Sequence, residues 1–137
     1  MHSTFTLSLA DAQALIDHVL AAVAGANKGV AIAITDPHGE LIAFARTDAC
    51  PLPSITIAIN KAYTAARERK PSKDVGDASQ RYGFPMTNFG ELRFVTWGGG
   101  FPIWHEGRVI GAMGVSGLPE EEDMQLATNA IKSLALG

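Results

Sequence analysis

Two short turns, each between apolar segments, constrain the fold of this chain more than any other feature. The turn Asp36–Gly39 separates Val30–Thr35 from Glu40–Arg46, and the turn Glu106-Gly107 precedes Arg108–Ser116. Proline fixes φ inside the first turn, and glycine tolerates positive φ at its last position. Strands joined by turns this short pair antiparallel. The chain is therefore expected to form hairpins and not a repeated strand–helix–strand array.

Helical spacing marks the other segments. A Ser-x-x-Asp signal at Ser8 predicts a helix from Leu9 to about Ala24, and Ser54 is expected to cap a second helix that ends near Arg69. Pro119 is expected at the first position of the last helix. The sequence signals are weakest between the second helix and the glycines Gly98–Gly100. There they predict a short helix near residues 75–82 and a strand over Leu92–Trp97.

The resulting order is α-β-β-α-β-β-β-α. It predicts an α+β fold in which helices pack on a five-stranded antiparallel sheet, as in profilin and PAS architectures. The 137 residues suit one domain, 1–137, and the 47% apolar and 18% charged fractions are those of a compact protein.

Charge and cysteine content narrow the function classes. The formal net charge is −3, with no Lys/Arg block free of acidic residues, so no nucleic-acid partner is expected. The single cysteine, Cys50, excludes an internal disulfide and a multi-cysteine metal site. No segment reaches the length of a membrane span and the first residues lack a signal peptide, so we expect a cytoplasmic protein without a membrane partner.

An ordered series of short motifs runs along nearly the whole chain. It comprises Asp36-x-x-Gly39-x-Leu41, Arg46-x-Asp48, Asn60-Lys61-Ala62-x-Thr64, Gly98-Gly99-x-x-Pro102, Ile110-Gly111-Ala112-x-Gly114-Val115-Ser116-Gly117 and Glu122-Asp123. This series resembles the GlcG/HbpS-like family, also called the haem-degrading domain family. It is also similar to the C-terminal domain of PduO-type corrinoid adenosyltransferases.

The resemblance implies a small domain that assembles into homo-oligomers and binds a tetrapyrrole in some members, chiefly haem. It also implies a haem-iron ligand on the first helix, where His18 is the candidate metal ligand. By helical geometry His18 lies about 200° from Ile16, on a face that carries Ala14, Ala21 and Ala22. A flat macrocycle would fit such a small, smooth face. The other interpretation is a solvent-exposed or subunit-interface histidine.

A second group of candidates is polar. Lys61 and Thr64 share one face of the second helix, and Arg46 ends the second strand. Cations beside Gly98, Gly99 and Gly100, whose backbone can approach a ligand closely, suit a carboxylate or a propionate. These six residues, with His18, are the predicted cofactor-binding set. Ordinary structural ion pairs are the other interpretation.

Three functions follow from these candidates. The first is an oligomeric binding domain for haem or a related tetrapyrrole, in storage, sensing or transfer. The second is a small enzyme of organic-acid catabolism, a lyase, isomerase or deaminase, with Lys61, Arg46 and Glu122 as candidate acid–base groups. The third is a purely structural domain. Glu122 belongs to Glu121-Glu122-Asp123, where the family commonly has Glu-Gln-Asp.

Overall fold

The computed structural model describes residues 1–136 and contains four long helices, one short 3-10 helix and four strands. Gly137, where the predicted single domain ends, lies outside the described residues. In chain order the elements are α1 (Leu9–Val23), β1 (Ala31–Thr35), β2 (Leu41–Arg46), α2 (Pro53–Glu68), α3 (Ser72–Tyr82), η1 (Met86–Phe89), β3 (Gly100–His105), β4 (Arg108–Ser116) and α4 (Glu120–Ser133).

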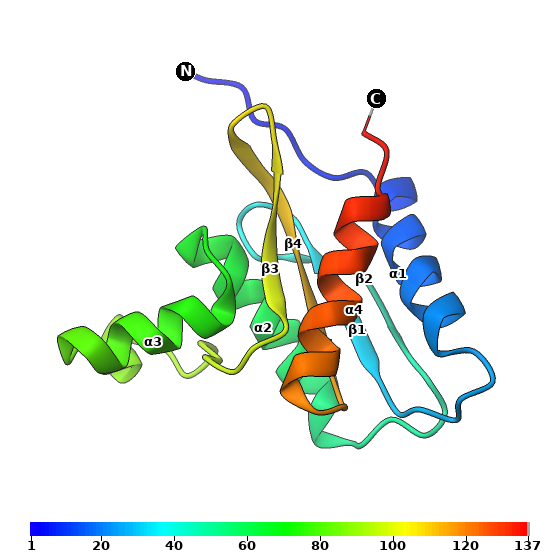
Figure 1. Ribbon diagram of the computed structural model, residues 1–137. Coiled ribbons are helices and arrows are strands. Elements are labelled where there is room, and N and C mark those ends of the chain that lie inside the picture. Colours follow the sequence, from blue (N-terminus) through cyan, green and yellow to red (C-terminus); the bar gives the residue numbers. More distant parts are fainter. Residues whose placement is uncertain (137) are drawn as a thin grey trace.

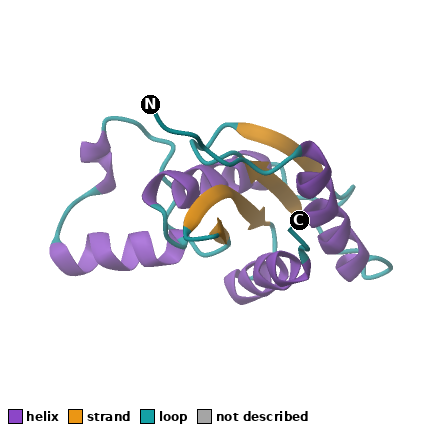
Figure 2. Cartoon of the chain, turned by 90° about the horizontal axis from the view of Figure 1, so that it is seen from above, coloured by secondary structure: helices purple, strands orange, loops and turns teal. Residues whose placement is uncertain are grey.

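The four strands form one antiparallel sheet in the order β2-β1-β4-β3. Helices α1 and α4 pack on one face of this sheet and against each other, while α2 covers the opposite face. The strands therefore lie between two helical layers, and α3 projects from one side of the molecule (Figure 1, Figure 2). The predicted α+β class and both hairpins are confirmed.

The two faces of the sheet differ in side-chain size. Strand β1 alternates alanine and isoleucine, and Ile32 and Ile34 join the larger core under α1 and α4. On the other face, Ala31 and Ala33 pack against Ala58 and Ala62 of α2. A Cβ atom added at Gly114 would collide with the carbonyl oxygen of Ala58. Small residues thus bring α2 very close to the sheet.

The prediction of a fifth strand over Leu92–Trp97 is wrong: residues 91–99 contain bends and no strand. Within Leu92–Trp97, two backbone groups bond to side chains of helices. Val95 N donates to Thr64 Oγ1, and Trp97 O accepts a hydrogen bond from Ser72 Oγ. The observed order is therefore α-β-β-α-α-β-β-α.

The start of α1 agrees with the sequence prediction, and the start of α2 does not. Ser8 caps α1 in the predicted capping box with Asp11. Helix α2 begins two residues earlier than expected, at Pro53, and has no side-chain cap. Ser54 is instead a buried residue of its first turn. Among the described residues, no helix is both long and apolar enough to span a bilayer.

Candidate functional site

A cleft of about 340 Å³ opens where the end of β4 and the start of α4 meet α2. We call it the Lys61 cleft. Its walls come from α2, from the segment before β3 and from the β4–α4 connection. The lining residues are Ser54, Ile57, Lys61, Trp97, Gly98, Ser116, Gly117, Leu118, Glu120 and Asp123.

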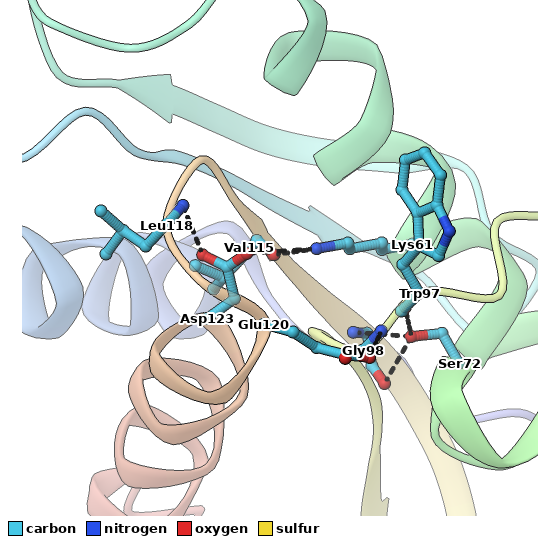
Figure 3. A network of polar contacts seen from close by, with 9 residues as sticks. Lys61, Ser72, Trp97, Gly98, Val115, Leu118, Glu120 and Asp123 are labelled. Atoms are coloured by element: carbon cyan, nitrogen blue, oxygen red, sulfur yellow. Dashed lines mark hydrogen bonds and ion pairs between the residues drawn. The ribbon is translucent and has the colours of Figure 1, made fainter.

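Lys61 and Asp123 form a buried ion pair at the base of this cleft. The two residues are only 3% and 2% exposed. Lys61 Nζ lies 2.9 Å from Val115 O and 3.4 Å from Asp123 Oδ2 (Figure 3). The other oxygen of Asp123, Oδ1, accepts a hydrogen bond from Leu118 N at 3.1 Å. This pair therefore links α2, β4 and α4.

Burial shifts both members of the pair toward their neutral forms. Desolvation lowers the pKa of Lys61, and the charges of Asp123 and Glu120 oppose that change. Desolvation likewise raises the pKa of Asp123, against the charge of Lys61 and backbone hydrogen bonds from Leu118 and Gly117. An amine and a carboxyl group with pKa values displaced toward each other can exchange a proton more easily than a solvated pair.

A second set of hydrogen bonds fixes the glycines beside the cleft. Glu120 Oε1 accepts from Gly98 N at 2.7 Å, and Ser72 Oγ accepts from Gly100 N at 2.9 Å (Figure 3). Gly99 has φ of +130°, and a Cβ atom there would lie 2.9 Å from Lys61 Nζ. Gly99 and Gly100 are needed for close contact with Lys61, while the N–H groups of Gly98 and Gly100 are already engaged.

The other predicted polar residues lie outside this cleft. Arg46 is exposed at the end of the edge strand β2 and does not line the cleft. Glu122 faces Lys28 on the surface, with 3.6 Å between their charged atoms. Thr64 is buried, donating to Asn60 O and accepting from Val95 N. The structure thus brings Lys61 and Gly98 together, and the carboxylate that meets Lys61 is Asp123.

His18 occupies a different layer of the molecule, on α1, and does not line the Lys61 cleft. It is half-buried, between the exposed alanines Ala14, Ala21 and Ala22 along the helix. Its Nδ1 atom is buried and has no hydrogen-bond partner within residues 1–136. No group of three or more His, Cys, Asp or Glu side chains that could hold a metal ion occurs in the same residues.

The predicted site set named Glu122 as its carboxylate and did not include Asp123, Glu120, Ser72 or Trp97. Of these four residues, only Glu120 and Asp123 could have been recognised from their spacing in the sequence. Glu120 and Asp123 are three residues apart, so they share one face of α4, whereas Glu121 and Glu122 point elsewhere. Ser72 and Trp97 come from the region whose structure was predicted least well, and no motif linked them to Lys61.

We predict that the ion pair is strongly coupled. Lys61→Met or Asp123→Asn alone should lower the free energy of unfolding by about 3–5 kcal/mol, because each leaves a buried group without its partner. The double variant Lys61→Met/Asp123→Asn should lower the free energy of unfolding by less than the sum of the two single variants. Urea unfolding followed by circular dichroism measures the free energy of unfolding of all three variants.

Lys73→Met, which breaks the exposed Lys73–Asp77 pair, is the control and should change the free energy of unfolding by less than about 0.5 kcal/mol. Equal effects of Lys61→Met and Lys73→Met would contradict the prediction.

Comparison with known proteins places this architecture in a family. A family model described as haem degrading protein HbpS-like matches residues 7–132. An uncharacterized 15.0 kDa protein of Citrobacter freundii, from the dhaT-dhaS intergenic region, is 37% identical over 92% of this chain and 90% of its own. Protein GlcG of Escherichia coli K12 is 36% identical over 66% of each chain. Corrinoid adenosyltransferase PduO of Salmonella typhimurium is 34% identical over 79% of this chain, which spans only 33% of PduO.

One of the similar solved structures is a complex with haem. The crystal structure of a PduOC:heme complex superposes with a TM-score of 0.87, at 28% identity, over 96% of this chain and 97% of the other. The resemblance drawn from the sequence motifs is confirmed: the chain belongs to the HbpS-like haem-degrading domain family.

Proposed function

We propose that this protein is an oligomeric binding domain for haem or a related tetrapyrrole, with His18 as the axial ligand. The observation that carries the proposal is the haem complex of PduOC, which matches nearly the whole length of this chain. A storage, sensing or transfer role would follow from reversible binding.

The surroundings of His18 fit a haem ligand. A buried polar atom without a partner calls for an explanation, and Nδ1 of His18 is one. Because Nδ1 is buried, an incoming iron would bind the other ring nitrogen, Nε2. The exposed alanines of α1 leave room for a planar ring beside it. Bound haem would supply a redox-active iron whose potential depends on its axial ligand.

The Lys61 cleft is less suited to a tetrapyrrole. Its volume of about 340 Å³ is at the low end for small-molecule sites, which begin near 300 Å³. The cation of Lys61 is neutralised by Asp123, and Glu120 adds a negative charge. A propionate group would therefore find little attraction there. The predicted roles of Lys61, Thr64 and the glycines in cofactor binding thus receive less support than that of His18.

Exposed apolar side chains favour assembly with further copies of the chain. Tyr82, Phe89 and Leu92 belong to α3, η1 and the segment after them, which project from the rest of the fold (Figure 1). Leu92 is 87% exposed. Exposed apolar groups that lie close together commonly mark an interaction surface. We propose that this arm takes part in a homo-oligomer.

A second candidate function rests on the Lys61–Asp123 pair. With the pKa of Lys61 lowered and that of Asp123 raised by burial, the pair suits proton transfer to or from a small organic acid. Such a lyase, isomerase or deaminase would act without Arg46 and Glu122 in the cleft, since both lie elsewhere. The missing arginine makes this candidate the weaker one.

The haem proposal predicts stoichiometric uptake of hemin. Titration of the metal-free protein should give a sharp Soret band that saturates near one haem per chain. His18→Ala should weaken binding and shift the band, because the axial ligand is lost. His105→Ala, whose imidazole lies beside Glu106, is the matched control and should bind as the wild type does. A signal that never saturates and ignores His18→Ala would contradict the proposal.

The assembly proposal predicts a mass that is a multiple of 14.5 kDa in sedimentation equilibrium. Leu92→Glu should dissociate the assembly, since a charge in an apolar interface must lose its hydration. Leu52→Glu, at another exposed leucine, serves as control and should leave the mass unchanged. A wild-type protein that sediments as a monomer would exclude this interface.

The enzymatic candidate predicts proton exchange. A panel of 2-oxo and 2-hydroxy acids in D₂O would be followed by NMR for loss of the C3 protons of the 2-oxo acids and of the C2 proton of the 2-hydroxy acids. Lys61→Met and Asp123→Asn should abolish any exchange that the wild type catalyses, and Lys132→Met, at an exposed lysine of α4, should not. Both active-site variants are first checked for folding by circular dichroism. Exchange that persists in folded Lys61→Met would remove this role.

A further inference from the structure

Three arginines converge on one side of the molecule, away from both His18 and the Lys61 cleft. Arg67 and Arg69 lie at the end of α2, and Arg108 begins β4. All three are exposed, and none forms an ion pair within residues 1–136. This concentration of unpaired positive charge is unusual in a chain whose net charge is −3.

The arginines line two adjoining hollows of about 410 and 470 Å³. Both hollows include Pro37, His38 and Arg69, so they form one continuous groove. Arg108 completes the first hollow and Arg67 the second. We call this surface the Arg groove. The one carboxylate among its lining residues is Glu40.

Two of the guanidinium groups are held in place without a carboxylate partner within residues 1–136. Arg67 lies 4.7 Å from the centre of the Tyr63 ring, and its Nε donates to His38 O at 2.9 Å. Arg108 lies 4.9 Å from the centre of the Phe5 ring. Stacking on an aromatic face restricts a guanidinium group and leaves the donors at its edge available. Ordering before binding reduces the entropy lost when a ligand binds.

Arg69 joins the two hollows. Its backbone has φ of +58°, in the left-handed region that a residue with a side chain rarely adopts. This conformation ends α2 and accompanies the placement of Arg69 beside the turn Asp36–Gly39. No hydrogen bond engages its guanidinium within residues 1–136.

We propose that the Arg groove binds a small molecule that carries two or more oxyanion groups, phosphate or carboxylate. Guanidinium groups match both chemistries because each can donate two parallel hydrogen bonds to one oxyanion. Arg67 and Arg108 lie at the two ends of a shared groove, so they recognise separate anionic groups of one ligand, with Arg69 between them. The site is distinct from the haem site proposed on α1.

Isothermal titration calorimetry of the full chain with inorganic pyrophosphate tests this proposal at low ionic strength and again at about 0.5 M NaCl. Binding should saturate at one ligand per chain below about 10 mM. Arg69→Gln and Arg108→Gln should each weaken it about tenfold or more, because each removes a charged donor. Arg81→Gln, at an exposed arginine of α3, is the control and should bind as the wild type does. A parallel titration with citrate distinguishes phosphate from carboxylate recognition.

Phe5→Ala separates the orientation of Arg108 from its charge. This variant keeps every arginine but removes the ring under Arg108, so it should weaken pyrophosphate binding less than Arg108→Gln does. Hemin uptake should be unchanged in Arg69→Gln, which keeps this test independent of the haem proposal. The absence of saturable binding by either anion would overturn the proposal, and so would equal losses in Arg69→Gln and Arg81→Gln.

Discussion

The close contact between α2 and the sheet determines how the rest of the site is built. Alanine and glycine form the facing surfaces, and the carbonyl oxygens of Ala58 and Lys61 occupy the space where side chains at Gly114 and Gly100 would stand. A long side chain that leaves α2 at this contact cannot point toward the sheet. Lys61 therefore runs along the sheet to its end, where its ammonium group reaches Val115 O and Asp123. The buried ion pair is a consequence of this packing, because a charge placed there needs a partner.

Local signals predicted the parts of the fold that local interactions hold together. Each hairpin depends on its own turn, and α1 depends on the capping box of Ser8 and Asp11, so short stretches of sequence were enough. The prediction of a strand over Leu92–Trp97 was wrong for the opposite reason. Its alternation resembles a strand, yet its hydrogen-bond partners are Thr64 and Ser72, which lie 31 and 25 residues away from Val95 and Trp97 in the chain. In this segment, tertiary contacts of this kind outweigh the intrinsic preference for a strand.

The candidate site was predicted in part for a similar reason. Lys61 and the glycines could be singled out because the series of family motifs runs through them. The choice of carboxylate required the orientation of α4 around its axis, since four successive acids open that helix. The helix turns Asp123 inward and leaves Glu122 beside Lys28. The Arg groove was not foreseen at all, because Arg67, Arg69 and Arg108 meet only after β4 and α2 have packed together.

Three chemically distinct surfaces thus occupy three different parts of one small fold. His18 lies on α1, in the layer opposite α2, whereas the Lys61 cleft and the Arg groove lie at different positions along α2. Sites that share no side chains respond to substitution almost independently. The Lys61–Asp123 pair is the exception, because it joins α2, β4 and α4 and its loss would loosen the scaffold on which the other surfaces depend. A change at that pair therefore carries information about ligand binding only when the stability of the variant is measured with it.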